Sequence, residues 1–194
     1  LFSVEPPTCV DNEVFFHNHS TTASGFITEW HWDFGDGNTQ SVIYPDNPSV
    51  SHTYAAAGNY MVNLTVINSN SCENDFQDMV TVNSSPESMF TNNSTCAGNP
   101  TNFYDTSLEN GGGAISTYMW NFDDPNSGSE NTSTLQNPSH VYSNAGDYEV
   151  TLETSNINGC IDVTVVTITV LDEPEVDFTY NEACLGSETE FQSE

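Results

Sequence analysis

The stretch EWHWDFGDGNTQ, residues 29–40, decides how the rest of the chain is interpreted. Trp30, Trp32 and Phe34 share one face of an extended strand, because side chains on a strand alternate with a period of two. The GDGN that follows joins two glycines to an aspartate, a combination typical of tight turns. The stretch therefore predicts a central strand with a buried tryptophan, closed by a turn, in the core of a β-sandwich.

The chain repeats itself with a period of about 88 residues. Trp32 recurs as Trp120, and AAAGNYMVNLTV (55–66) recurs as SNAGDYEVTLET (143–154). A fixed internal period indicates an array of similar structural units. We predict repeat 1 at residues 1–86, repeat 2 at residues 87–173, and the beginning of an incomplete third repeat at residues 174–194.

Each repeat is predicted to be all-β. MVNLTVIN and DMVTVN in repeat 1, and EVTLETSN and DVTVVTITVL in repeat 2, alternate apolar and polar residues at the period of a strand. Six or seven short strands in about 88 residues fit a two-sheet sandwich. The predicted core residues are Trp32, Phe34, Tyr60, Val62 and Leu64 in repeat 1, and Trp120, Phe122, Tyr148, Val150 and Leu152 in repeat 2.

The composition excludes several functions. The chain has no Lys or Arg and a formal net charge of −28, so nucleic acid and anionic lipid are repelled. No run of eighteen apolar residues is present, and we expect no membrane insertion in this segment. Leu1 starts within a strand-like pattern without a signal peptide, so we expect the segment to belong to a larger protein. A trypsin-like protease finds no cleavage site here, which favours an exposed, protease-rich setting.

The motifs resemble the PKD domain, an immunoglobulin-like β-sandwich. In repeat 1 the resemblance rests on WDFGDG, on HTY (52–54) and on AGNYMVNLTV (57–66). Repeat 2 departs from the first motif with WNFDDP but keeps NPSHVY (137–142) and AGDYEVTL (145–152). The variant with cysteines is similar to PKD repeats in large Bacteroidota surface proteins, including gliding adhesins. The resemblance implies tandem immunoglobulin-like sandwiches that act as spacer or adhesion modules.

The five cysteines follow the same period. Each repeat has one early and one late cysteine, which predicts the disulfides Cys9–Cys72 and Cys96–Cys160. Cys184 is then expected to bond a residue beyond 194. Closing each loop of about 63 residues would stabilise a repeat by roughly 4 kcal/mol. Buried free thiols are the alternative, and the cysteines are too dispersed for a zinc knuckle. We therefore predict an oxidising, extracellular location.

Calcium is the candidate cofactor, because the carboxylates have no Lys or Arg partner and oxygen clusters in loops attract hard cations. The candidate ligands are Asp33, Asp36 and Asn38 in repeat 1, and Asp123, Asp124 and Asn126 in repeat 2. No EF-hand motif is present, and a diffuse cloud of counterions is the alternative. His52 and His140, at equivalent positions, are expected to bond the backbone of a neighbouring loop.

No catalytic residues are predicted, because the chain has no nucleophile elbow and no recognisable triad context. The sequence favours a non-enzymatic stalk segment of a large secreted or cell-surface protein, whose partners are the neighbouring repeats of the same chain. One alternative is a protomer of an extracellular filament, in contact with other copies. The other is an accessory module of a secreted hydrolase that binds a glycan or another surface ligand.

Overall fold

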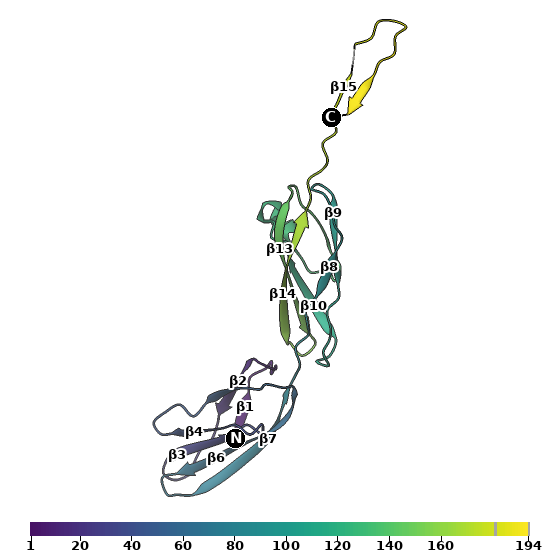
Figure 1. Ribbon diagram of the computed structural model, residues 1–194. Helices are drawn as coiled ribbons and strands as arrows, with labels where there is room; N and C mark the ends of the chain where they lie inside the picture. The colour runs from purple at the N-terminus through teal and green to yellow at the C-terminus, as the bar shows by residue number, and fades with distance from the viewer. Residues whose placement is uncertain (181, 194) are drawn as a thin grey trace.

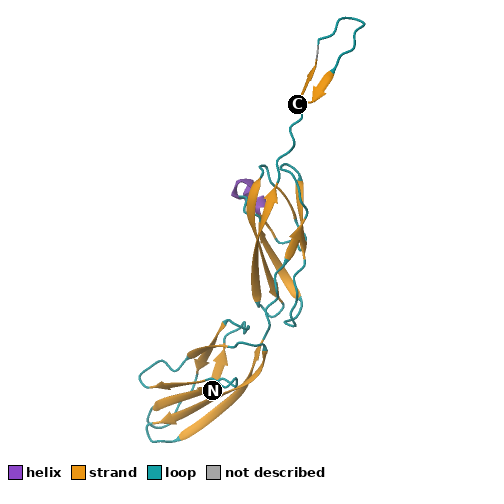
Figure 2. Ribbon diagram, viewed as in Figure 1, coloured by secondary structure: helices purple, strands orange, loops and turns teal. Residues whose placement is uncertain are grey.

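The computed structural model, shown in Figure 1, consists of two β-sandwiches and a short hairpin that follow one another along the chain. The structure describes residues 1–180 and 182–193. Strands dominate every unit, and within the described residues the one helical segment lies at the side of the second sandwich (Figure 2). The predicted fold class is confirmed: the chain is all-β, with two tandem immunoglobulin-like sandwiches.

Repeat 1 contains two antiparallel sheets. The three-stranded sheet has the order β1 (Phe2–Val4), β2 (Glu13–Asn18) and β5 (Val50–Thr53). The four-stranded sheet has the order β4 (Thr39–Ile43), β3 (Ile27–Asp33), β6 (Gly58–Asn68) and β7 (Glu73–Val82). The opening stretch is thus the central strand β3 followed by the turn into β4, as its alternation predicts.

Repeat 2 has the same topology. Its three-stranded sheet has the order β12 (Ser139–Val141), β9 (Pro100–Asp105) and β8 (Phe90–Asn92). Its four-stranded sheet has the order β11 (Thr132–Ser133), β10 (Ile115–Asn121), β13 (Gly146–Asn156) and β14 (Ile161–Val170). A 3-10 segment, η1 (Pro125–Asn131), replaces the glycine turn of repeat 1. Its proline explains the change, since Pro is tolerated at the start of a helical turn.

The two sheets of each repeat enclose an aromatic core. Trp32 is 1% exposed and Trp120 is fully buried. Each indole N–H is satisfied by a backbone carbonyl: Trp32 Nε1 donates to Pro48 O at 3.2 Å, and Trp120 Nε1 to Leu135 O at 2.8 Å. The other buried members of the predicted set are Phe34, Val62, Leu64, Phe122, Val150 and Leu152, while Tyr60 and Tyr148 are partly buried against the cores.

Residues after repeat 2 form a hairpin of β15 (Phe178–Tyr180) and β16 (Phe191–Ser193). Its register matches that of the first hairpin in each complete repeat. Phe178 is opposite Ser193, as Phe90 is opposite Asp105 in repeat 2. The hairpin therefore has the pairing expected of the first two strands of a further sandwich.

Within the described residues, no helix is long and apolar enough to cross a membrane.

Candidate functional site

A disulfide joins the two repeats. Cys9 of repeat 1 is bonded to Cys160 of repeat 2 across a sequence separation of 151 residues. The two Cα atoms are 5.6 Å apart, within the range that a disulfide spans, and both cysteines are fully buried. We call this bond the junction disulfide. It corrects the predicted pairs Cys9–Cys72 and Cys96–Cys160, because each of those pairs has one member in this bond.

The position of each cysteine along its sandwich explains the correction. Cys9 forms a parallel bridge with Asn83, directly after β7, whereas Cys72 lies in the turn that precedes β7. The ten residues of β7 separate these two ends by about 30 Å, far beyond the reach of a disulfide. Cys160 lies in the equivalent turn of repeat 2, which adjoins repeat 1. Cys72, Cys96 and Cys184 are free thiols in the structure.

Hydrogen bonds also hold the link between the repeats. Asn156 Nδ2 donates to Ser84 O at 2.9 Å, and the Ser88 N–H donates to Asp162 Oδ2 at 2.6 Å. Gly112 contacts the link so closely that a Cβ there would lie 2.0 Å from Ser84 O. Pro86, at the predicted boundary, is buried. The link is therefore fixed against repeat 2 and is not a free tether.

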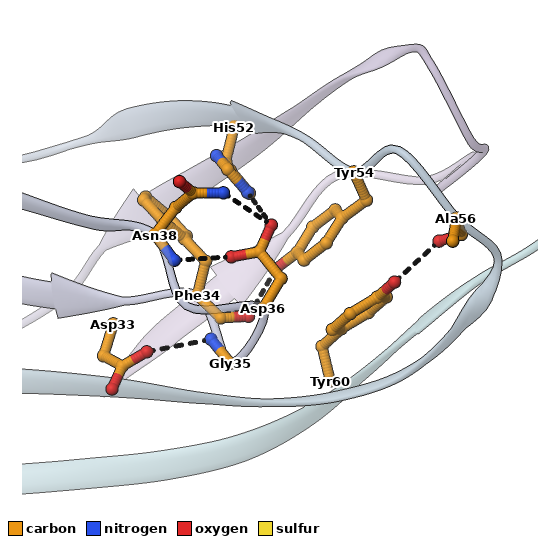
Figure 3. Close-up of polar contacts among 9 residues, drawn as sticks. All are labelled: Asp33, Phe34, Gly35, Asp36, Asn38, His52, Tyr54, Ala56 and Tyr60. Carbon is orange, nitrogen blue, oxygen red and sulfur yellow. Dashed lines mark hydrogen bonds and ion pairs between the residues drawn. The ribbon is translucent and has the colours of Figure 1, made fainter.

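A second polar cluster lies at the turn after β3 (Figure 3). Asp36 Oδ2 accepts a hydrogen bond from His52 Nε2 at 2.7 Å and one from Asn38 Nδ2 at 3.0 Å, while Oδ1 accepts the Asn38 N–H. Tyr54 Oη donates to Phe34 O at 3.1 Å, and the His52 ring stacks on Phe34. We call these residues the turn cluster of repeat 1.

Repeat 2 has an equivalent turn cluster despite its different turn. His140 Nε2 lies 3.1 Å from Asp124 Oδ2, and Tyr142 Oη donates to Phe122 O at 2.9 Å. The aspartate and the histidine are again sixteen residues apart. His52 and His140 were expected to bond loop backbone, but their partners are carboxylates. The repeated Asp–His spacing is the sequence signal that identifies these partners.

A tyrosine near the start of β6 and another near the start of β13 each close a corner of a sandwich. Tyr60 Oη donates to Ala56 O at 2.8 Å, and Tyr148 Oη donates to Asn144 O at 2.9 Å. Each bond returns to the backbone four residues upstream, which is the pattern of a tyrosine corner. These contacts stabilise the sandwich and bring no reactive group to the surface.

The candidate calcium ligands are used in separate local bonds. Asp33 Oδ1 accepts the Gly35 N–H at 3.0 Å (Figure 3), and Asp123 Oδ2 accepts the Glu149 N–H at 3.0 Å. Asp36 and Asp124 bond the histidines of the turn clusters, Asn38 bonds Asp36, and Asn126 lies exposed in η1. Across residues 1–180 and 182–193, no three His, Cys, Asp or Glu side chains form a group suited to a metal ion. Calcium binding stays a prediction.

The turn cluster changes the pKa of Asp36. Burial raises this pKa, but hydrogen bonds from His52 and Asn38 and the His52 charge lower it more, so that it lies below its ordinary value. Burial, with the nearby carboxylate of Asp36, raises the pKa of Tyr54; burial, with Asp124, raises that of Tyr142. The folded state thus favours an ionised Asp36 and neutral forms of both tyrosines.

A double-mutant cycle on Asp36→Ala and His52→Ala should give a coupling of about 1–2 kcal/mol at neutral pH, because the pair forms a mostly buried, charge-assisted hydrogen bond. Since the folded pKa of Asp36 is depressed, this stability is present above about pH 4 and is lost as the pH falls through the folded pKa. The exposed pair Glu29 and His31 is the matched control and should couple by less than about 0.5 kcal/mol. Equal coupling energies for the two pairs would contradict the stabilising role assigned to the Asp36–His52 hydrogen bond.

Alkaline titration should unfold both repeats cooperatively. Unfolded tyrosines ionise near pH 10. Because the folded pKa values of Tyr54 and Tyr142 are raised, their contribution is complete below about pH 10 and is lost as the pH rises further. After alkylation of the free thiols, tyrosinate absorbance should rise in a second step at a pH above that of the exposed tyrosines, and this step should coincide with loss of tryptophan fluorescence. In the variant Tyr54→Phe, the contribution of repeat 1 to this second step should be missing. An unchanged second step would contradict the assignment of the step to Tyr54 and Tyr142.

Tandem immunoglobulin-like sandwiches joined by a short link define a modular, repeat-built class of protein. The family model for the PKD domain matches residues 5–84 and again residues 83–170. The chain therefore belongs to the PKD domain family, and the resemblance to that domain is confirmed. Both matches lie within the two complete sandwiches.

Known proteins that contain related segments are much longer than this chain. Human polycystin-1 is 35% identical over 148 residues, which is 64% of this chain and 3% of polycystin-1. Collagenase ColA of Bacillus cereus is 35% identical over 79 residues, which is 40% of this chain and 8% of the collagenase. The chain therefore spans less than a tenth of either relative.

Solved PKD domains are also similar. The PKD1 domain of the Vibrio cholerae metalloprotease PrtV has 29% identity and a TM-score of 0.39, covering 44% of this chain and 96% of that domain. The PKD1 domain of Vibrio anguillarum Epp has 23% identity and a TM-score of 0.41, covering 47% and 99%. PKD repeats like these occur in extracellular proteins, including bacterial proteases and a collagenase, and disulfides are typical of the same location.

Proposed function

We propose that this chain is a non-enzymatic stalk segment of a large secreted or cell-surface protein. The observation that carries the proposal is the junction disulfide, because it bonds one repeat to the next. An accessory domain that only needs to fold gains stability from a disulfide within itself. A bond between domains instead limits how they move relative to each other, which is useful in a spacer.

The junction supports a semi-rigid string. The link from Ser84 to Ser88 is hydrogen-bonded to repeat 2 at both ends, and Cys9 is bonded to the adjoining turn at Cys160. Three separate attachments leave little freedom for hinge motion between the repeats. In a repeat protein each unit mainly contacts its neighbours, so fixed junctions set the shape of the whole array.

The charge of the chain suits the same role. With a net charge of −28 and no Lys or Arg, neighbouring strings repel each other and stay separate. The lack of Lys and Arg removes the cleavage sites of trypsin-like proteases, an advantage outside the cell. The adhesin-like surface context that the sequence resembles is part of this proposal, as is extracellular location.

A second candidate is an accessory module of a secreted hydrolase, which is favoured by the names of two relatives, a collagenase and a metalloprotease. A filament protomer is the third, since the edge strands β4 and β7 offer unpaired backbone to other chains. The stalk is preferred because the junction disulfide bonds one repeat to the next repeat of the same chain and not to a different chain.

Calcium binding at the turn loops is a separate proposal. The six candidate residues lie in or beside the turns that follow β3 and β10, in a chain without Lys or Arg, and a bound ion would offset local repulsion. Calorimetric titration should then give binding heat, and calcium should raise the melting temperature. Magnesium at equal ionic strength is the control, since a counterion cloud responds similarly to both ions. Equal responses to calcium and magnesium would support the diffuse counterion cloud instead of specific calcium binding.

Immunogold labelling of intact source cells with an antibody to residues 1–173 tests the stalk. Label along thin surface projections is the expected result. Label found in the medium and copurifying with a hydrolase would replace the stalk with the accessory module. Label confined to the cell interior would contradict every extracellular role.

A further inference from the structure

We propose that the junction disulfide recurs along the array, so that Cys96 bonds the late cysteine of the repeat that begins near residue 174. The early cysteines are Cys9, Cys96 and Cys184, and the late cysteines are Cys72 and Cys160. In this arrangement the early cysteine of each repeat reaches forward to the late cysteine of the next. The partner of Cys96 is therefore a segment of this same chain.

The early cysteines occupy the same structural position. Cys9 forms a parallel bridge with Asn83, and Cys96 forms one with Leu171. In repeat 1 the N–H of the residue after the cysteine donates to Asn83 O at 3.0 Å, and in repeat 2 the equivalent N–H donates to Leu171 O at 2.8 Å. Cys96 thus lies beside the end of repeat 2, where a further repeat follows, as Cys9 lies beside the end of repeat 1.

The same turn follows each early cysteine. The carbonyl oxygen of Cys9 accepts the N–H three residues later at 3.3 Å, that of Cys96 does so at 3.2 Å, and that of Cys184 at 2.9 Å. Cys184 lies between β15 and β16, whose register repeats that of the earlier hairpins. The third unit therefore begins with the local structure that carries the bond-forming cysteine in repeat 1.

The late cysteines are equivalent as well. The Cys72 N–H donates to Asn68 Oδ1 at 3.0 Å, and the Cys160 N–H donates to Asn156 Oδ1 at 3.1 Å. Both lie in the turn between the last two strands of a repeat, and in repeat 2 this turn adjoins repeat 1. Cys160 is bonded and buried, whereas Cys72 is exposed. Cys72 has the geometry to receive an early cysteine from a unit placed before repeat 1.

The links are also alike. Pro86 and Glu87 join repeats 1 and 2, and Pro174 and Glu175 stand 88 residues later, at the start of the third unit. A similar link places the next late turn beside Cys96, as the first link places Cys160 beside Cys9. By the period of the array, the partner cysteine lies about 88 residues after Cys160.

Bond formation needs an oxidant, and we propose that a thiol–disulfide oxidoreductase supplies it. The thiolate of one cysteine attacks the disulfide of this oxidase and forms a mixed disulfide, and the thiolate of the second cysteine then displaces the thiol of the oxidase. Two protein thiols lose two electrons and two protons, and the oxidase disulfide becomes a dithiol. The product is one inter-repeat disulfide for each junction.

This pattern makes the closed loops overlap. The loop from Cys9 to Cys160 contains Cys96, and the loop that begins at Cys96 contains Cys184. A backbone break in either link then lies inside a closed loop and does not divide the chain. Pairing within repeats would leave every link outside a loop, where a single cut separates the protein. The inference is independent of the stalk proposal, since a filament or an enzyme accessory can share it.

Non-reducing peptide mapping of the native full-length protein tests the inference. Free thiols are first alkylated, and the protein is digested at acidic and aromatic residues, since trypsin has no site in this segment. The Cys96 peptide should be linked to the peptide with the late cysteine of the third repeat. Cys9 linked to Cys160 in the same digest is the internal reference.

Three outcomes would overturn the proposal. Cys96 alkylated before reduction would show that it stays free. A link from Cys96 to Cys72 of a second copy would indicate assembly between chains. A link from Cys96 to Cys160 would show pairing within the repeat. None of these outcomes decides where the protein is located, so failure here is distinct from failure of the stalk.

Discussion

Replacement of Cys160 by alanine should lower the free energy of unfolding of the two-repeat unit by up to about 5 kcal/mol, the chain-entropy value for a loop of 151 residues. The loss arises because the unfolded chain is no longer closed between residues 9 and 160. Denaturation followed by tryptophan fluorescence measures this change. Each repeat should remain folded under native conditions, because both aromatic cores are intact.

The matched control is Cys72→Ala, which occupies the same turn in repeat 1 but is exposed and unbonded. It should change stability by less than about 0.5 kcal/mol. Small-angle scattering adds a readout of geometry: Cys160→Ala should broaden the distribution of distances between repeats, and Cys72→Ala should not. Equal effects of the two substitutions would show that the junction disulfide does not form.

Replacement of Trp120 by alanine should destabilise repeat 2 by about 4 kcal/mol. The indole is fully buried, contacts Phe90 and Phe103, and donates to Leu135 O. The substitution leaves a large cavity and an unpaired carbonyl, and the loss is comparable to the whole stability of a small domain. Repeat 1 should keep its native fluorescence, since Trp30 and Trp32 belong to a separate core.

The control for this substitution is Met119→Ala, the adjacent residue on β10, which points to the opposite face and is 57% exposed. It should cost no more than about 0.5 kcal/mol. Denaturation of both variants, with amide spectra assigned to each repeat, separates local from global loss. A Trp120→Ala protein as stable as Met119→Ala would contradict the assigned core.

The fold was predictable because local patterns and the global repeat agree. Alternation around Trp32 identifies a strand with one buried face, and its recurrence at Trp120 shows that the same unit is used twice. Two glycines predict the turn after β3, whereas the proline in WNFDDP gives η1 in repeat 2. The helical turn was not predicted, because short 3-10 segments have no strong sequence pattern.

The disulfide was not predictable from periodicity alone. A period of 88 residues is equally compatible with bonds inside each repeat and with bonds from one repeat to the next. Strand direction decides between them: β7 carries the chain from the Cys72 turn to the far end, where Cys9 lies beside Asn83. The sequence-based pairing counted cysteines for each repeat and left out the length of the strand between them.

The turn clusters were predicted only in part, unlike the fold, which was predicted, and the disulfide, which was not. Asp36 was identified as important but was assigned to calcium, while its bond to His52 was missed. The spacing of sixteen residues recurs between Asp124 and His140 and was visible in the sequence. The shared Asp–His spacing by itself does not show that the two side chains are in contact. Contact also requires that the packing of the two sheets places β5, which carries His52, beside the turn that carries Asp36.

The most direct test of the central claim cuts the backbone just after β8, in the first loop of repeat 2. A protease recognition sequence is inserted between Asn93 and Ser94, which are exposed. This site lies outside the two covalent rings, residues 9–72 and 96–160, that disulfides within the repeats would close. After cleavage, the fragments should run together on a non-reducing gel and separate when reduced. The same insertion in the Cys160→Ala variant should give separate fragments without reductant. Separation of the unsubstituted protein without reductant would contradict the Cys9–Cys160 bond and, with it, the account of a stapled junction.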